Sequence, residues 1–276
     1  IKLLQQQQNK PKKAPNKLII TMKQSFYQKE GKRKNKTIVF LHGFLEDHTI
    51  WQPITKALST EYFTLSIDLL GHGQTPTIAP VHTMEMMANQ VNDILLKEEI
   101  EHCTIVGHSM GGYVALAFTE LFPKKTEGIV LLNSTTLPDS PEKKVNRDRV
   151  LKVIDKEKEL FVRTAVTNLF SDENKTLMKS ALNKLIDIAM HTPNEGIKAA
   201  SLGMKQRPDR TELFEQLTAK KHIIMGKKDA LIPSDSLIAL AEKAGASYTL
   251  LSGGHLVYIE NEAETIEALH NFMAQP

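Results

Sequence analysis

The chain of 276 residues contains one cysteine, Cys103, and no uninterrupted apolar run of about eighteen residues. A single cysteine excludes a disulfide within the chain, so the fold does not require an oxidising compartment. Because there is no such apolar run, no membrane-spanning helix is predicted. Residues 1–21 also lack the apolar segment of a secretory signal. We therefore expect a cytoplasmic protein without a membrane span, in which Cys103 is a buried residue of an apolar strand.

Sequence motifs for metal and cofactor binding are missing as well. The acids and histidines do not form a ligand spacing such as H-x-x-x-H with a third partner, so we expect no metal site. No G-x-G-x-x-G pattern opens the first predicted helix, which argues against a dinucleotide. We expect a protein that works without a cofactor on a small-molecule substrate. Its oligomeric state cannot be read from these features.

The charged residues are unevenly distributed along the chain. Residues 1–36 carry eleven Lys and Arg against one acid, a net charge of +10, whereas the remainder has a net charge of −7. The body of the protein is therefore mildly acidic, and no nucleic-acid partner is expected. Residues 1–21 are rich in Gln, Lys, Asn and Pro, and Met22 could open a domain. We interpret residues 1–21 as a disordered leader or a segment added for expression; the alternative is a basic arm that contacts an anionic surface.

Short β-branched apolar runs alternate with helical patterns over most of the chain, which predicts an α/β fold with a mostly parallel sheet covered by helices on both faces. Residues 23–36 are interpreted as an opening hairpin whose second strand begins near Thr37. Chemistry in such sheets collects at the carboxyl ends of the strands. The predicted strands cover residues 37–41, 62–68, 103–106, 128–133, 221–226 and 247–251. The predicted helices between them cover residues 50–59, 84–98, 113–122, 209–217, 234–244 and 262–274.

The alternation stops between residues 135 and 207, where apolar residues recur at helical spacing. We interpret residues 135–207 as a helical cap inserted into a core made of residues 22–134 and 208–276. The alternative is that these helices belong to the core. The helical patterns in this segment cover residues 142–157, 160–170, 174–191 and 194–205.

The stretch Gly107-His108-Ser109-Met110-Gly111-Gly112 lies between a strand pattern and a helical pattern. It matches G-x-S-x-G, in which a serine sits at the tip of a strained strand-to-helix turn. Side chains at Gly107 and Gly111 would collide with the neighbouring strand and helix. The Ser109 hydroxyl would then point out above the sheet, close to the free N–H groups of the helix. The alternative is an ordinary helix start with Ser109 as its N-cap.

Two residues on later loops would complete the chemistry that a nucleophilic serine needs. A serine hydroxyl requires a base to remove its proton and an acid to orient that base. Asp229 lies three residues after a predicted strand, and His255 follows the last strand after two glycines. We expect His255 to be general base and then general acid, and Asp229 to fix its tautomer. The rival acids are Asp235, which fits the following helix better, and Asp139, which fits the entry to the cap.

Stabilising the negative charge that develops on the substrate requires two further hydrogen-bond donors. The N–H of Met110, directly after Ser109, is one. The loop after the strand at residues 37–41 supplies the other, which we assign to Phe44, with Leu45 as the nearest alternative. Three further histidines are interpreted as structural residues of these loops: His42, His72 and His108.

These motifs together resemble the α/β-hydrolase superfamily in its capped form, over residue 37 to the C-terminus. The resemblance implies an eight-stranded sheet, a Ser-Asp-His triad and no cofactor. Since position 109 is Ser and not Asp, it disfavours haloalkane dehalogenases and epoxide hydrolases. It rests on His42-Gly43-Phe44, Asp68-Leu69-Leu70-Gly71-His72-Gly73, the serine turn at residues 107–112, Gly226 with Asp229, and Gly254-His255 followed by Glu260.

We therefore expect a serine hydrolase that acts on small, mostly apolar carboxylic esters or lactones through an acyl-enzyme on Ser109. One alternative is a carbon–carbon bond hydrolase or related lyase of the same family, with Arg163 or Arg207 gripping a substrate carboxylate. Another is a ligand-binding or signalling member with very slow turnover. The substrate pocket is expected between cap and sheet. The candidate lining residues are Phe44, Met110, Leu137, Phe161, Leu231 and Val257.

Overall fold

The computed structural model describes residues 24–275, so the interpretation of residues 1–21 as a leader lies outside the described residues. Within them, one sheet has seven strands in the order β1-β3-β2-β4-β5-β6-β7, where eight were expected. All neighbouring strands are parallel except β1, which is antiparallel to β3. The strands are β1 (Tyr27–Glu30), β2 (Thr37–Leu41), β3 (Phe63–Ile67), β4 (Cys103–His108), β5 (Thr126–Leu132), β6 (Lys220–Gly226) and β7 (Ser247–Leu251).

The prediction of an opening hairpin over residues 23–36, whose second strand begins near Thr37, is wrong, because these two strands do not pair with each other. Strand β1 lies beside β3 and not beside β2, with Tyr27 opposite Ile67. Strand β2 already pairs with β3 on one side and β4 on the other, so both of its edges are occupied. The outer edge of β3 is the position left for β1, which covers it.

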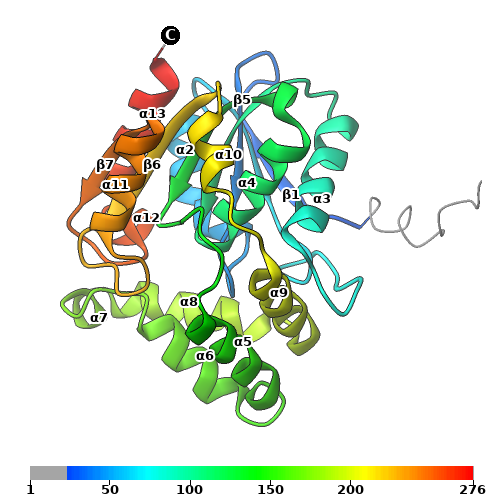
Figure 1. Ribbon diagram of the computed structural model, residues 1–276, viewed down its shortest axis with the longest axis vertical. Coiled ribbons are helices and arrows are strands. Elements are labelled where there is room, and N and C mark those ends of the chain that lie inside the picture. Colours follow the sequence, from blue (N-terminus) through cyan, green and yellow to red (C-terminus); the bar gives the residue numbers. More distant parts are fainter. Residues whose placement is uncertain (1–23, 276) are drawn as a thin grey trace, which may run out of the picture.

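Helices cover both faces of the sheet, as the alternation predicted (Figure 1). On β2, Val39 and Leu41 belong to the apolar cluster that includes α3, α4 and α11, whereas Ile38 and Phe40 belong to the cluster that includes α2 and α13. Alternate residues of a strand thus bury on opposite faces. The flanking helices are α2 (Gln52–Leu58), α3 (Met84–Lys97), α4 (Met110–Leu121), α10 (Thr211–Gln216), α11 (Ser234–Ala244) and α13 (Glu262–Ala274), with short turns η1 (His48–Trp51), η2 (Pro123–Lys125) and α12 (Val257–Glu260).

Five of the six helices between β5 and β6 lie together beyond one end of the sheet (Figure 1, lower part). Their apolar positions pack against one another, and α6 contacts α8 while α5 contacts α9. The helix expected over residues 174–191 is divided at Met178, whose backbone leaves the helical region. None of the helices in residues 24–275 is long and apolar enough to cross a membrane. The five helices are α5 (Pro141–Val153), α6 (Lys158–Thr167), α7 (Asn174–Leu177), α8 (Lys179–His191) and α9 (Asn194–Gln206).

The thiol of Cys103 is expected to be chemically inert in the folded protein. Cys103 is the first residue of β4 and has no exposed surface. Burial raises the pKa of this thiol to about 12, so almost no reactive thiolate forms at neutral pH. A disulfide reagent such as 5,5′-dithiobis(2-nitrobenzoate) should leave the native protein unlabelled and titrate one thiol per chain in denaturant. Rapid stoichiometric labelling of the native protein would contradict this burial.

Candidate active site

Ser109 occupies a strained turn between β4 and α4. Its backbone has φ 47° and ψ −110°, a region that costs a non-glycine residue free energy. A Cβ atom at Gly107 would lie 2.3 Å from the carbonyl oxygen of Gly111, and one at Gly111 would lie 2.2 Å from the carbonyl oxygen of Leu41. Only glycine fits either position without moving the backbone. The side chain of Ser109 makes no capping hydrogen bond, so it does not act as an ordinary N-cap.

Asp229 and His255, 26 residues apart, meet at the same edge of the sheet. Nδ1 of His255 donates to Oδ2 of Asp229 at 2.8 Å, and both side chains are buried. This bond places the proton on Nδ1 and leaves Nε2 as an acceptor. Asp229 is held in turn by the side-chain amide of Asn133 at 2.9 Å and by the N–H groups of Leu231 and Ile232.

The environment of Asp229 keeps it ionised. Burial alone would raise the pKa of this carboxyl, but the charge and hydrogen bond of His255 lower it, as do the donors of Asn133 and Leu231, and the net pKa lies below its usual value. An ionised Asp229 stabilises positive charge on the His255 ring. The pair is therefore suited to accept a proton at His255 Nε2.

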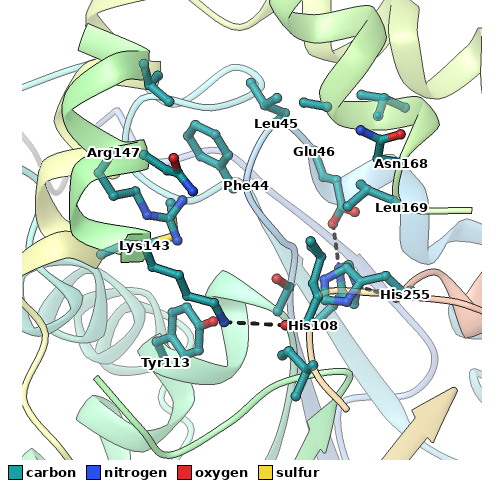
Figure 2. A pocket seen from close by; sticks show the side chains of 18 of the residues that line it. Phe44, Leu45, Glu46, His108, Tyr113, Lys143, Arg147, Asn168, Leu169 and His255 are labelled. Atoms are coloured by element: carbon teal, nitrogen blue, oxygen red, sulfur yellow. Dashed lines mark hydrogen bonds and ion pairs between the residues drawn. The ribbon is translucent and has the colours of Figure 1, made fainter. Parts of the chain in front are cut away.

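Ser109 and His255 line one cavity of about 350 Å³ (Figure 2). Among residues 24–275, Oγ of Ser109 has no hydrogen-bond partner, so it is not engaged in holding the fold. In enzymes the bond between nucleophile and base is often long before substrate binds and tightens in the substrate complex. The structure thus brings Ser109, Asp229 and His255 to one site, with the hydroxyl at the cavity wall.

Two backbone N–H groups beside this cavity are available as donors. Phe44 lines the cavity, and Met110 is the first residue of α4. Neither N–H donates to an acceptor within the described residues. The next residue, Leu45, has φ 67°, so the loop turns sharply at this point. Free donors at a loop and at a helix N-terminus are the elements from which an oxyanion hole is built.

A buried ion pair in the cavity wall was not foreseen from the sequence. Oε2 of Glu46 lies 2.9 Å from Nδ1 of His108, and Nε2 of His108 lies 3.0 Å from the carbonyl oxygen of His255. Both ring nitrogens of His108 therefore face acceptor oxygens, which requires the protonated ring. Glu46 also accepts the N–H of Gly43 at 2.6 Å and the hydroxyl of Tyr258 at 2.8 Å. The pair thus joins the loop that carries Phe44 to the loop that carries His255.

Glu260 forms a second link, between the His255 loop and the helices beyond the sheet. Oε1 of Glu260 accepts the N–H of Gly254 at 2.9 Å. Its other oxygen accepts from the N–H and the hydroxyl of Ser171 and from the side-chain amide of Asn174. The N–H of His255 donates to the carbonyl oxygen of Leu169 at 2.9 Å. The position of the His255 loop is therefore set partly by the segment between α6 and α8.

The expected pocket residues are divided by the structure into two groups. Phe44, Phe161 and Leu231 line the cavity. Met110 and Val257 are fully buried in the apolar clusters, and Leu137 is 50% exposed on the entry to α5, so these three lie outside the lining. Side-chain direction at the start of α4 and in the segments at residues 134–140 and 252–257 decides this, and hydrophobic periodicity carries no information about it.

His42, His72 and Asp139, which were considered from the sequence, take structural positions. His42 Nδ1 donates to the carbonyl oxygen of Gly43, and its Nε2 accepts the N–H of Leu69, so the ring braces two loops. His72 contacts the carbonyl oxygen of Leu70, and burial lowers its pKa to about 3. Asp139 pairs with Arg147 and Arg207, whereas the carboxylate bound to His255 is that of Asp229. Residues 24–275 contain no cluster of three His, Cys, Asp or Glu that could hold a metal.

Comparison with known proteins agrees with this architecture. An esterase of Thermogutta terrifontis superposes with a TM-score of 0.86 at 28% identity, over 90% of this chain and 92% of the other. The enol-lactonase of Burkholderia xenovorans gives 0.83 at 24% identity, over 91% and 96%. A 2-hydroxy-6-oxononadienedioate/2-hydroxy-6-oxononatrienedioate hydrolase of Escherichia coli is 24% identical over 260 residues, 88% of each chain. The family model of the alpha/beta hydrolase fold matches residues 36–262, and the chain belongs to this family.

Proposed function

We propose that this protein is a serine hydrolase of small carboxylic esters or lactones, with Ser109, His255 and Asp229 as its triad. The observation that carries the proposal is the strained, unbonded Ser109 on the wall of a cavity that His255 shares, with Asp229 fixing the His255 tautomer. Membership of the alpha/beta hydrolase family supports hydrolysis, as does the structural similarity to an esterase and to an enol-lactonase.

The reaction follows from the positions of these groups. His255 Nε2 removes the proton of Ser109 as the hydroxyl oxygen attacks the ester carbonyl carbon. The N–H groups of Phe44 and Met110 bind the oxygen that becomes negative. The protonated His255 then gives its proton to the departing alcohol, which leaves an acyl group on Ser109. A water molecule, activated by His255, releases the acid and restores the serine.

We also propose that residues 135–207 form a cap domain over this site, with the core in residues 22–134 and 208–276. The support is that the cavity is lined from both sides. Phe161, Val166 and Leu169 come from α6 and the turn after it, whereas Phe44, Ser109 and His255 come from loops of the sheet. More than half of the lining residues are apolar or aromatic, which favours a small substrate with a largely apolar body.

Labelling with a fluorophosphonate probe tests the nucleophile directly. The wild-type chain should form one covalent adduct on a peptide that contains Ser109, and Ser109→Ala should form none. A panel of p-nitrophenyl esters from acetate to octanoate then measures the preferred acyl length. Labelling at another serine would refute the assignment of Ser109.

A carbon–carbon bond hydrolase that uses the same triad is the second candidate, and the Escherichia coli relative favours it. Neither Arg163 nor Arg207, the two arginines considered from the sequence, is placed to bind the carboxylate of such a substrate. Arg163 pairs with Glu159 on the exposed face of α6, and Arg207 is buried against Asp139. Product analysis after incubation with a vinylogous diketone separates the candidates, because ester hydrolysis leaves the carbon skeleton intact.

A further inference from the structure

The side of the cavity formed by α5 carries more positive than negative charge. Asp139 is the carboxylate at this position, and it is shared by two arginines: Arg207 Nη1 at 2.6 Å and Arg147 Nε at 3.0 Å. Arg207 is buried and further fixed by the carbonyl oxygens of Leu137 and Met204. Two guanidinium groups thus share one carboxylate, and the cluster keeps a net charge of one positive unit.

Arg147, on the cavity wall, has hydrogen-bond donors without a partner among residues 24–275. A guanidinium has five N–H donors in a planar fork. In Arg147 the Nε group is bound to Asp139, and the two terminal nitrogens have no hydrogen-bond partner among residues 24–275. The side chain is 21% exposed, and neither terminal nitrogen is among the buried unpaired atoms of the described residues, so both are accessible to a ligand. A planar, bidentate acceptor such as a carboxylate matches this fork.

Lys143 stands one helical turn before Arg147 and adds a second cation. Its ammonium donates to the carbonyl oxygen of Leu231 at 3.4 Å, and no carboxylate of the described residues lies within ion-pair distance. Burial lowers the pKa of Lys143, and the charges of Arg207 and Arg147 lower it further. Lys143 lines the cavity although the residue as a whole is exposed, which places it where the cavity meets solvent.

These two cations face the catalytic side of the same cavity. Figure 2 shows Lys143 and Arg147 along one side and His108 and His255 on the other. The wall from α6 is apolar, with Phe161 and Val166. The cavity thus combines a catalytic side, an apolar wall from α6 and a cationic end formed by Lys143 and Arg147, within about 350 Å³.

We propose that the substrates are esters or lactones that also bear a carboxylate, which Lys143 and Arg147 bind while the ester carbonyl lies at Ser109. This inference rests on the proposed serine hydrolase function and refines its substrate class. The hydrolysed product is then a molecule with two acidic groups, or a hydroxy acid that keeps the first carboxylate.

Matched substrates isolate the contribution of the charge. Monoethyl adipate carries a terminal carboxylate, and ethyl 6-amino-6-oxohexanoate replaces it with a neutral amide of the same size. The wild-type enzyme should show a kcat/KM about tenfold or more higher for the monoester, because a charge-assisted hydrogen bond exceeds a neutral one. Equal values for the two substrates, or a preference for the amide, would overturn the inference. The succinate and glutarate pairs give the spacing between the ester and the cations.

Variants on α5 test the two residues. Lys143→Gln and Arg147→Gln should each lower kcat/KM for the monoester by about tenfold, and leave the amide ester within about twofold. Lys144→Gln and Arg149→Gln remove a charge from the same helix at exposed positions outside the cavity lining, and should change neither value. A variant that slows both substrates equally would show that the residue supports the fold and not the carboxylate.

Direct binding separates failure of this inference from failure of the hydrolase proposal. Calorimetry of Ser109→Ala with monoethyl adipate and with the amide ester measures the preference without turnover. Tighter binding of the monoester that Arg147→Gln abolishes would support the cationic end even if the wild type hydrolyses neither. Hydrolysis of neutral esters alone, with equally weak binding of both ligands, would refute the carboxylate and leave the serine mechanism intact.

Discussion

Ser109→Ala is expected to lower turnover of p-nitrophenyl butyrate by about 10⁴-fold or more, the largest effect of any single substitution. Alanine removes the oxygen that attacks the carbonyl, and no acyl-enzyme can form. KM should change little, since the cavity is lined mainly by other side chains. The measurement is steady-state hydrolysis corrected for the background rate, with melting temperature as a check on folding.

Ser236→Ala is the matched control for this substitution. Ser236 is exposed on α11 and lies outside the cavity lining, so its loss should leave turnover within about twofold. Retention of more than a tenth of wild-type activity by Ser109→Ala would remove Ser109 from the mechanism. The same result with unaltered fluorophosphonate labelling would direct the search to another nucleophile.

Glu46→Gln is expected to lower the free energy of unfolding by roughly 3–5 kcal/mol near pH 6. The substitution leaves the His108 ring buried between a neutral side-chain amide and the His255 carbonyl oxygen, without its countercharge. Breaking a buried pair by removal of one partner is strongly destabilising for this reason. Urea unfolding, followed by circular dichroism, measures the change. Glu101→Gln, an exposed position without a side-chain partner among the described residues, should stay within about 0.5 kcal/mol of wild type.

The stabilisation from this pair should depend on pH in both directions. Burial alone would raise the pKa of Glu46, but the His108 charge and the Gly43 donor bring it below the ordinary value of 4.5, so its contribution is lost as pH falls through the lowered value. Burial alone would lower the pKa of His108, but Glu46 brings it above 6.5, so its contribution is lost as pH rises through the raised value. The difference between wild type and Glu46→Gln should therefore be largest between pH 4.5 and 6.5. A difference independent of pH would show that the loss is one of packing.

Most of the sheet and the turn at Ser109 can be predicted because each is marked by a short, continuous stretch of the chain. Buried strands are continuous apolar runs, and the glycines at 107 and 111 are required by backbone atoms a few ångströms away. Asp229 and His255 could be proposed because each follows a strand end, and parallel strands bring those ends to one edge. Their assignment as catalytic residues stays a prediction that the geometry supports.

Features that depend on distant contacts could not be predicted in this way. In the sequence, Glu46 has no feature that distinguishes it from other loop acids. Its partner His108 lies 62 residues later, and only the fold brings the two together. Lys143 resembles a solvated helix charge in the sequence, and only the fold shows that it lines the cavity. The pairing of β1 with β3 likewise depends on which sheet edge is left open after the parallel strands assemble.

The contacts of Glu260 bear on how new specificities could be engineered into this scaffold. Because its two oxygens bind Gly254 on one side and Ser171 with Asn174 on the other, a transplanted helical segment from another enzyme would arrive without partners for this carboxylate. A chimera should therefore keep residues 169–174 of the host, or import a matching acid at position 260. Exchange of α5 and α6 alone leaves these hydrogen bonds untouched and replaces seven of the 19 residues that line the cavity.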